Sequence, residues 1–191
     1  MQLLAKIRKP RLESFLIHIV NLHLSYAAAE KLRRQFPEFV VFPHRSEAAN
    51  ALGELPEEDL LVLGTPPENA AELKLLLFLS RCVRKAWTAP DVRTRDWRMF
   101  GLRAQLFSIY LDLDDPWPDS PPPMVALEQA LWYLQAQGRR AKCCGNEYCS
   151  APYFFATRKN QKFCCDECAI PAKREAKLRW WNENRGKGPR K

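Results

Sequence analysis

The sequence predicts a mostly α-helical protein in two parts, and three observations support this prediction. Apolar residues recur at helical spacing along much of residues 1–138. Six of the seven cysteines fall between Cys143 and Cys168. The formal net charge of +8 is carried by the C-terminal end of the chain. We therefore expect a helical N-terminal domain over residues 1–138 and a small module with a β-hairpin and a helix over residues 139–191.

Four stretches of the N-terminal part have helical periodicity. Residues 11–36 place their apolar side chains on one face, and Pro37 ends this helix. Residues 68–87 are apolar on nearly every side, which places them at the centre of a bundle. Residues 124–134 predict a last helix with Gly138 as its C-cap. The remaining stretch, residues 96–111, has an expected buried face made of Trp97, Phe100, Ala104, Phe107 and Leu111.

Shorter signals separate these helices. Residues 39–42 suit a strand, Ser46 could cap a short helix, and residues 60–63 fit either a strand or a helix. Residues 114–123 contain five prolines and predict an extended loop. His18 and His23 are five residues apart, which is off the spacing that lets two imidazoles on one helix share a metal, so we interpret them as structural.

The cysteines form two pairs with the spacing of a metal site. Four residues separate Cys144 from Cys149, and three separate Cys164 from Cys168, with fourteen residues between the pairs. Four thiolates are the donor set of a closed, tetrahedral, structural zinc site. Disulfides are disfavoured because disulfide frameworks belong to secreted chains, of which the sequence gives no sign. The neighbouring Cys143 and Cys165 remain alternative ligands.

The residues around the pairs predict a treble-clef-like zinc ribbon. Residues 153–156 form a strand, residues 157–161 a polar turn and residues 162–164 a return strand. A basic helix follows, with Cys168 in its first turn. Pro171 is also expected in the first turn, where its missing N–H costs little.

Basic residues are concentrated in the same module. Residues 139–191 contain 14 Lys and Arg against 5 Asp and Glu, whereas residues 1–138 contain 16 against 17. This partition indicates a polyanionic partner for the C-terminal module. The longest apolar run, residues 75–79, is far shorter than the roughly 20 residues of a membrane span, so we expect no membrane partner. Outside the module only Cys82 is a cysteine, which favours a reducing cytoplasm.

The helix after Cys168 has two different sides. At about 100° per residue, Ala172, Ala176 and Trp180 follow Cys168 in one row, so Trp180 is expected to be buried against the hairpin. Cations and Trp181 gather on another side, which suits phosphate contacts with an aromatic ring beside them. The alternative is that Trp181 packs on the N-terminal domain and the charges are only solvated. The residues expected to contact nucleic acid are Arg158, Lys159, Lys173, Arg174, Lys177, Trp181 and Arg185.

From Cys144 to about Arg185 the sequence resembles the CGNR-type zinc fingers of bacterial proteins. In that family, cysteine pairs flank a hairpin that ends in an aromatic–cysteine step, here Phe163–Cys164, and a basic helix follows, here residues 174–181 with the sequence R-E-A-K-L-R-W-W. The resemblance implies a zinc-dependent DNA-binding regulator with a separate helical N-terminal domain. It also implies four ligands, which are Cys144, Cys149, Cys164 and Cys168. The family's Gly-Asn-Arg follows its last cysteine, whereas this chain has Ala-Ile-Pro there, so base-contacting residues are not transferred.

These observations lead to one functional expectation and one alternative. We expect a cytoplasmic, nucleic-acid-binding protein that depends on one structural Zn²⁺, specifically a bacterial DNA-binding transcription regulator. Its helical domain would sense a ligand or form a homodimer. The alternative is a zinc-stabilised adaptor that docks on an acidic protein partner. No enzyme is expected, because the sequence has no Ser/His/Asp set, phosphate loop or His-rich metal motif, and a zinc closed by four cysteines cannot activate water.

Overall fold

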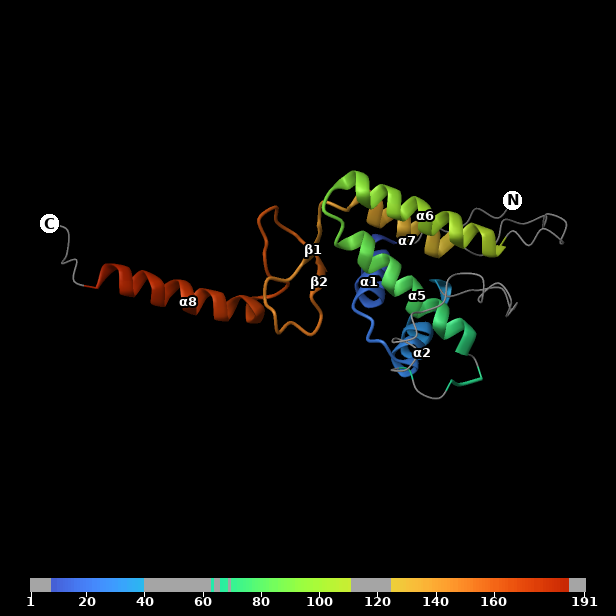
Figure 1. Cartoon of the computed structure of the whole chain (residues 1–191), viewed down its shortest axis with the longest axis horizontal. Helices are drawn as coiled ribbons and strands as arrows, with labels where there is room; N and C mark the ends of the chain where they lie inside the picture. Colours follow the sequence, from blue (N-terminus) through green and yellow to red (C-terminus); the bar gives the residue numbers. More distant parts are fainter. Residues whose placement is uncertain (1–7, 40–62, 64–65, 69, 111–124, 186–191) are drawn as a thin grey trace.

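The computed structural model describes residues 8–39, 63, 66–68, 70–110 and 125–185 (Figure 1). Within these residues the mostly α-helical class, with a small two-stranded sheet near the C-terminus, is confirmed. In chain order the elements are α1 (Lys9–Val20), α2 (Tyr26–Gln35), the short 3-10 helix η1 (Pro37–Phe39), α5 (Ala70–Trp87), α6 (Val92–Tyr110), α7 (Val125–Ala136), β1 (Ala141–Cys143), β2 (Tyr153–Phe155) and α8 (Asp166–Asn184).

Several short predictions fall outside the described residues. They are the strand at residues 40–42, the helix capped by Ser46, residues 60–62, the proline-rich loop at 114–123 and the tail after Arg185. Two residues at the edges of these predicted segments are described. Phe39 lies in η1, and both Phe39 and Leu63 are buried in the hydrophobic core of the bundle.

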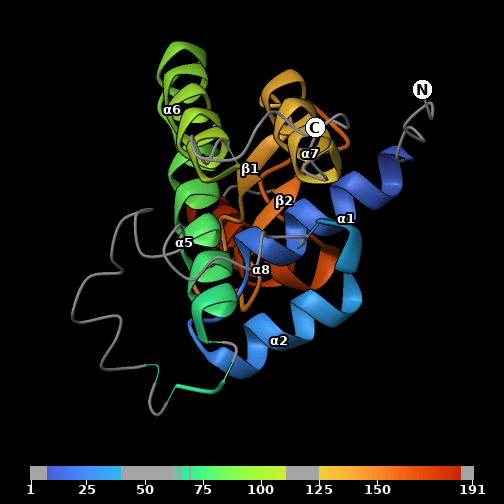
Figure 2. The ribbon, with the colours of Figure 1, turned by 90° about the vertical axis from the view of Figure 1, so that its right-hand side faces the viewer.

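The helical bundle is built around α1 and α5. The α1 helix packs against both α5 and α7, and α2 packs against α5 (Figure 2). The consecutive residues Leu75, Leu76 and Leu77 are all buried, so α5 is covered on most of its circumference. The central position predicted for this helix is therefore confirmed. Phe15 fills the space beside α1 by stacking on Phe39, with 4.2 Å between ring centroids.

The prediction of a single helix over residues 11–36 is wrong, because α1 ends at Val20 and a second helix begins at Tyr26. Ser25 caps the new helix α2 by accepting a hydrogen bond from the Ala28 N–H at 3.2 Å. The guanidinium of Arg84 donates to the carbonyl of Val20 at 2.7 Å and to the carbonyl of Leu22. Side-chain partners of this kind satisfy the backbone groups that a helix end leaves free, so the interruption is stabilised from both sides.

The buried face predicted for α6 is wrong at Trp97, Phe100 and Ala104, which are exposed, while the side chains of Phe107 and Leu111 lie outside the described residues. Trp97 is 74% exposed and Phe100 is 62% exposed, whereas Met99, Leu102 and Leu106 are buried. Apolar residues occupy two sides of this helix, so periodicity alone does not decide which side turns inward. The packing of α6 against both α5 and α7 decides it.

The sheet pairs β2 with a different segment from the predicted return strand. Ala141 pairs with Phe155 and Cys143 pairs with Tyr153, in antiparallel register. The sequence predicts the second strand at residues 162–164, whereas residues 141–143 form it in the structure. Tertiary contacts explain the difference, because Ala141 is buried in the bundle core and the Trp87 indole N–H donates to the Lys142 carbonyl at 3.0 Å.

The sheet is joined to the bundle by polar and aromatic contacts. Phe155 lies 4.7 Å from Trp87, ring centroid to ring centroid. The Asn21 side chain donates to the Tyr153 carbonyl at 2.9 Å and accepts from the Tyr153 N–H at 3.1 Å, as a neighbouring strand would. Arg140 donates to Glu13 at 2.8 Å. These contacts hold the first part of the module on the bundle, while the division of the chain at residue 138 into two domains stays a prediction.

The Asn21 contact can be tested by substitution. Asn21→Ala removes both hydrogen bonds to the half-buried Tyr153 backbone, so we expect the free energy of unfolding to fall by about 1–3 kcal/mol. Urea unfolding followed by circular dichroism measures this change. Asn182→Ala, on the exposed part of α8, is the matched control and should leave the midpoint unchanged. An Asn21→Ala protein as stable as the parent would show that this contact contributes nothing.

Candidate metal centre

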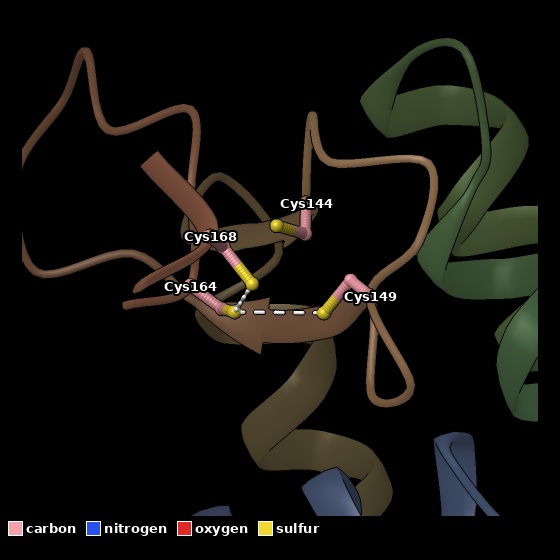
Figure 3. Close-up of side chains that lie close together, drawn as sticks. All are labelled: Cys144, Cys149, Cys164 and Cys168. Carbon is pink, nitrogen blue, oxygen red and sulfur yellow. Dashed lines mark hydrogen bonds between the residues drawn. The ribbon is translucent and has the colours of Figure 1, made fainter. Parts of the chain in front are cut away.

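Four thiols converge beside the two-stranded sheet. Cys144 follows β1, Cys149 lies in the connection to β2, Cys164 lies just before α8, and Cys168 is in the first turn of α8. Their Sγ atoms all lie within 4.8 Å of one another (Figure 3). In the described part of the chain, these four residues form a group that could hold a metal ion, and they are the four that the sequence predicts.

The distances between the sulfur atoms fit a metal site rather than disulfides. Cys164 Sγ lies 3.5 Å from Cys168 Sγ and 3.7 Å from Cys149 Sγ. Four sulfurs each about 2.3 Å from a tetrahedral zinc ion would be about 3.8 Å apart. A disulfide would need about 2.05 Å. The donor set and its spacing therefore fit one tetrahedral ion, while the identity of the metal rests on the preference of four thiolates for zinc.

Backbone hydrogen bonds join the two halves of the centre. The Cys144 N–H donates to the Pro152 carbonyl at 2.7 Å, which closes the connection between the strands. The Gly145 N–H donates to the Lys162 carbonyl at 2.8 Å, which ties this connection to the segment before α8. A Cβ at Gly145 would lie 3.4 Å from that same carbonyl oxygen and from the Phe163 ring, so this part of the connection is packed against the segment before α8.

The protonation of the thiols differs within the cluster. Burial acts against ionisation of Cys144, but N–H groups of Asn146 and Cys164 outweigh it and lower the pKa of Cys144. Burial and the surrounding thiols of Cys168 and Cys149 hold the pKa of Cys164 far above its usual range. Four thiolates at such close range repel one another, so the cluster needs a cation to hold them all ionised.

The two alternative ligands lie at the surface. Cys143 belongs to β1 and precedes Cys144, so its side chain leaves the strand on the opposite face. Cys165 is exposed at the N-cap of α8, and its Sγ is 3.7 Å from Cys164 Sγ without joining the group of four. The structure therefore brings together the pairs that the spacing favours.

The α8 helix extends away from the bundle (Figure 1). Ala169 is its buried residue, and the large apolar side chains of Ile170, Leu178, Trp180 and Trp181 are exposed. The prediction that Trp180 is buried is wrong, because this side chain is 60% exposed. The sheet that was expected to cover Trp180 instead packs on the bundle and does not follow α8 outward.

Pro171 also lies at a different place from the predicted one. The helix begins at Asp166, so Pro171 is its sixth residue and lies inside the helix. Its missing N–H removes the bond that the Glu167 carbonyl would otherwise accept. The prediction placed Pro171 in the first turn because it started the helix later.

The predicted nucleic-acid contacts are all exposed. Arg158 and Lys159 lie in the turn after β2, and the others lie along or just after α8. Lys173 forms an exposed ion pair with Asp166, with 3.4 Å between its Nζ and the carboxylate oxygen. Nothing in the described part of the chain buries Lys173, Arg174, Lys177, Trp181 or Arg185.

Sequence reasoning missed the residues that seat the metal centre on the bundle. Asn21 and Trp87 bind backbone atoms of β2 and β1, and Arg140 pairs with Glu13. A polar residue such as Asn21 in an otherwise apolar helical run was the one available signal. Its partner, Tyr153, lies 132 positions further along the chain, so no local pattern could identify it.

Comparison of the chain with family models, curated proteins and solved structures gave no match. The resemblance to CGNR-type zinc fingers therefore stays a prediction from the sequence. A separate search of the described helices found none long and apolar enough to cross a membrane.

Substitution of single cysteines distinguishes the ligand sets. We expect purified Cys168→Ser to lose most of its bound zinc, because three thiolates leave the tetrahedral shell open. Cys143→Ser and Cys165→Ser are the matched controls and should each retain about one zinc per chain. Elemental analysis after gel filtration measures the metal content. If Cys165→Ser lost its zinc and Cys168→Ser retained it, the result would show that Cys165, and not Cys168, is the metal ligand.

Thiol reactivity gives a second test on the unaltered chain. With metal bound, a thiol reagent should react quickly with the two exposed residues, Cys143 and Cys165. Cys82 should react slowly, because its thiol is half-buried and burial raises its pKa. Removing the ion with a chelator should expose the four clustered thiols to the reagent. Equal reactivity before and after chelation would contradict a metal centre at this position.

Proposed function

We propose that this protein binds nucleic acid through the exposed helix α8, and that a zinc ion held by the four thiols stabilises the module that presents this helix. DNA is the expected polymer and transcription regulation the expected role. The observation that carries the proposal is an exposed helix with cations on one side, placed at the end of a chain whose positive charge is concentrated there.

The dimensions and charges of α8 support a polyanionic partner. Its 19 residues correspond to about 28 Å, a length over which duplex DNA carries many phosphates. Lys177 is followed one turn later by Trp181 and then by Arg185, and all three side chains are exposed. Cations can neutralise phosphates there, while an indole at 57% exposure can lie against a sugar or a base.

The metal would have a structural role in this function. Four thiolates leave zinc no open coordination position, so the ion would not activate water or bind a substrate. Its work would be to hold Cys164 and Cys168, and with them the start of α8, against the segment that carries Cys144 and Cys149. The helical bundle then remains free for a sensing or dimerising role.

A protein-docking role is the second candidate, and one observation favours it. Ile170, Leu178, Trp180 and Trp181 are large apolar residues exposed on the same helix, which is more apolar surface than phosphate contacts require. An acidic protein with an apolar groove would use both the cations and these side chains. Recovery of a protein partner after nuclease treatment would support this candidate.

Salt dependence tests the nucleic-acid proposal. With about six phosphate contacts, the logarithm of the association constant should fall with the logarithm of salt concentration at a slope near −5. Replacing Lys173, Arg174 and Lys177 together with Ala should reduce the slope to about −2 to −3 and leave zinc content unchanged. Random duplex DNA, single-stranded DNA and structured RNA serve as probes in gel-shift titrations.

The control removes the same charge from the bundle. Lys74, Lys85 and Arg93 are exposed on α5 and α6, and their combined replacement with Ala should leave affinity and slope unchanged. Absence of binding to all three probes would overturn the proposed function. An unchanged slope in the α8 variant would place the contacts elsewhere.

A further inference from the structure

A pocket lies where α1, α2 and the metal-binding segment meet. Its volume is about 490 Å³, within the range of about 300–1,000 Å³ that small-molecule sites occupy. Most of its lining comes from α1, α2 and the turn between them. The remaining lining residue is Ala151, two positions after Cys149. The pocket therefore touches both the bundle and the segment that supplies half of the thiols.

The floor of the pocket is apolar. Leu22 and Leu32 are buried, and Ile17 and Ala28 are half-buried beside them. This surface suits a hydrocarbon group, because burying it removes apolar area from water.

The rim carries basic groups and no acidic one. The titratable residues in the lining are His18, His23 and Lys31, and no Asp or Glu is among the lining residues. The ring of His18 is already engaged, with its Nδ1 2.7 Å from the Ser14 carbonyl and its Nε2 3.4 Å from the Gln35 amide nitrogen. The side chains of Lys31 and His23 are exposed and have no hydrogen-bond or ion-pair partner among the described residues.

We propose that this pocket binds a small carboxylic acid with an apolar body. Its carboxylate accepts hydrogen bonds from Lys31 and His23, and its hydrocarbon part covers the floor formed by Leu22 and Leu32. A cationic ligand is disfavoured because Lys31 would repel it without a compensating carboxylate in the lining. This inference goes beyond the proposed function, because it concerns the bundle and needs no nucleic acid. Through Ala151 it gives the bundle a ligand site in contact with the metal module.

The test uses the zinc-loaded full chain and three probes that differ in the head group alone. Hexanoate, 1-hexanol and hexylamine share a six-carbon body and are negative, neutral and positive. The chain has three histidines, so the imidazole proton signals can be assigned by substituting each in turn. We expect hexanoate to shift the signals of His18 and His23 saturably, with a dissociation constant on the order of 1–10 mM. The shifts with 1-hexanol should need at least fivefold higher concentration, and hexylamine should give none.

Two lysine variants separate this site from non-specific binding. Lys31→Gln should weaken hexanoate binding at least fivefold, and the exposed Lys31 side chain can be removed without disturbing the core. Lys74→Gln, on an exposed site of α5 outside the pocket, should leave the affinity unchanged. Equal binding of all three probes, undiminished binding in Lys31→Gln, or no shift at 50 mM hexanoate, about five times the upper expected dissociation constant, would each overturn the proposal.

Discussion

The convergence of four thiols is the contact on which the position of α8 depends. Cys144 and Cys149 come from one side of the sheet connection, and Cys164 and Cys168 from the start of the helix. Beyond this point α8 buries one residue, Ala169, so apolar packing in the described part of the chain cannot hold it. An ion bound by all four sulfurs would supply the missing free energy, as structural zinc does in modules too small for a core of their own.

The other side of the metal centre is fixed by the helical bundle. Phe155 packs between Trp87 and Tyr133, and the Asn21 side chain pairs with the Tyr153 backbone beside it. The strands therefore belong to the bundle core as much as to the metal module. This arrangement anchors the segment that carries Cys144 and Cys149 to the bundle, while α8 extends away from it (Figure 1). A ligand between α1 and Ala151 would touch this anchored side.

Local patterns predicted the features that depend on local spacing. Two cysteine pairs and a buried leucine run are visible in the sequence because neighbouring positions carry the whole signal. The failures occur where distant partners decide. Met99 rather than Trp97 faces the core because of how α6 packs, and the helix break at Asn21 depends on Arg84 as well as on a local Ser25 cap. The second strand was misplaced for the same reason. The resemblance to CGNR-type zinc fingers stays a prediction from the sequence.

Because α8 extends away from the bundle, a tilt of the helix at the candidate metal centre would move its far end. About 24 Å of helix lies beyond Cys168, since each residue adds about 1.5 Å. A tilt of about 10° at the metal centre would therefore move the far end by roughly 4 Å. Because the helix is long, a small change in how Cys164 and Cys168 are held would cause a larger displacement at Trp181 and Arg185. Events at the thiols and events at the far end of the helix are in this way mechanically connected.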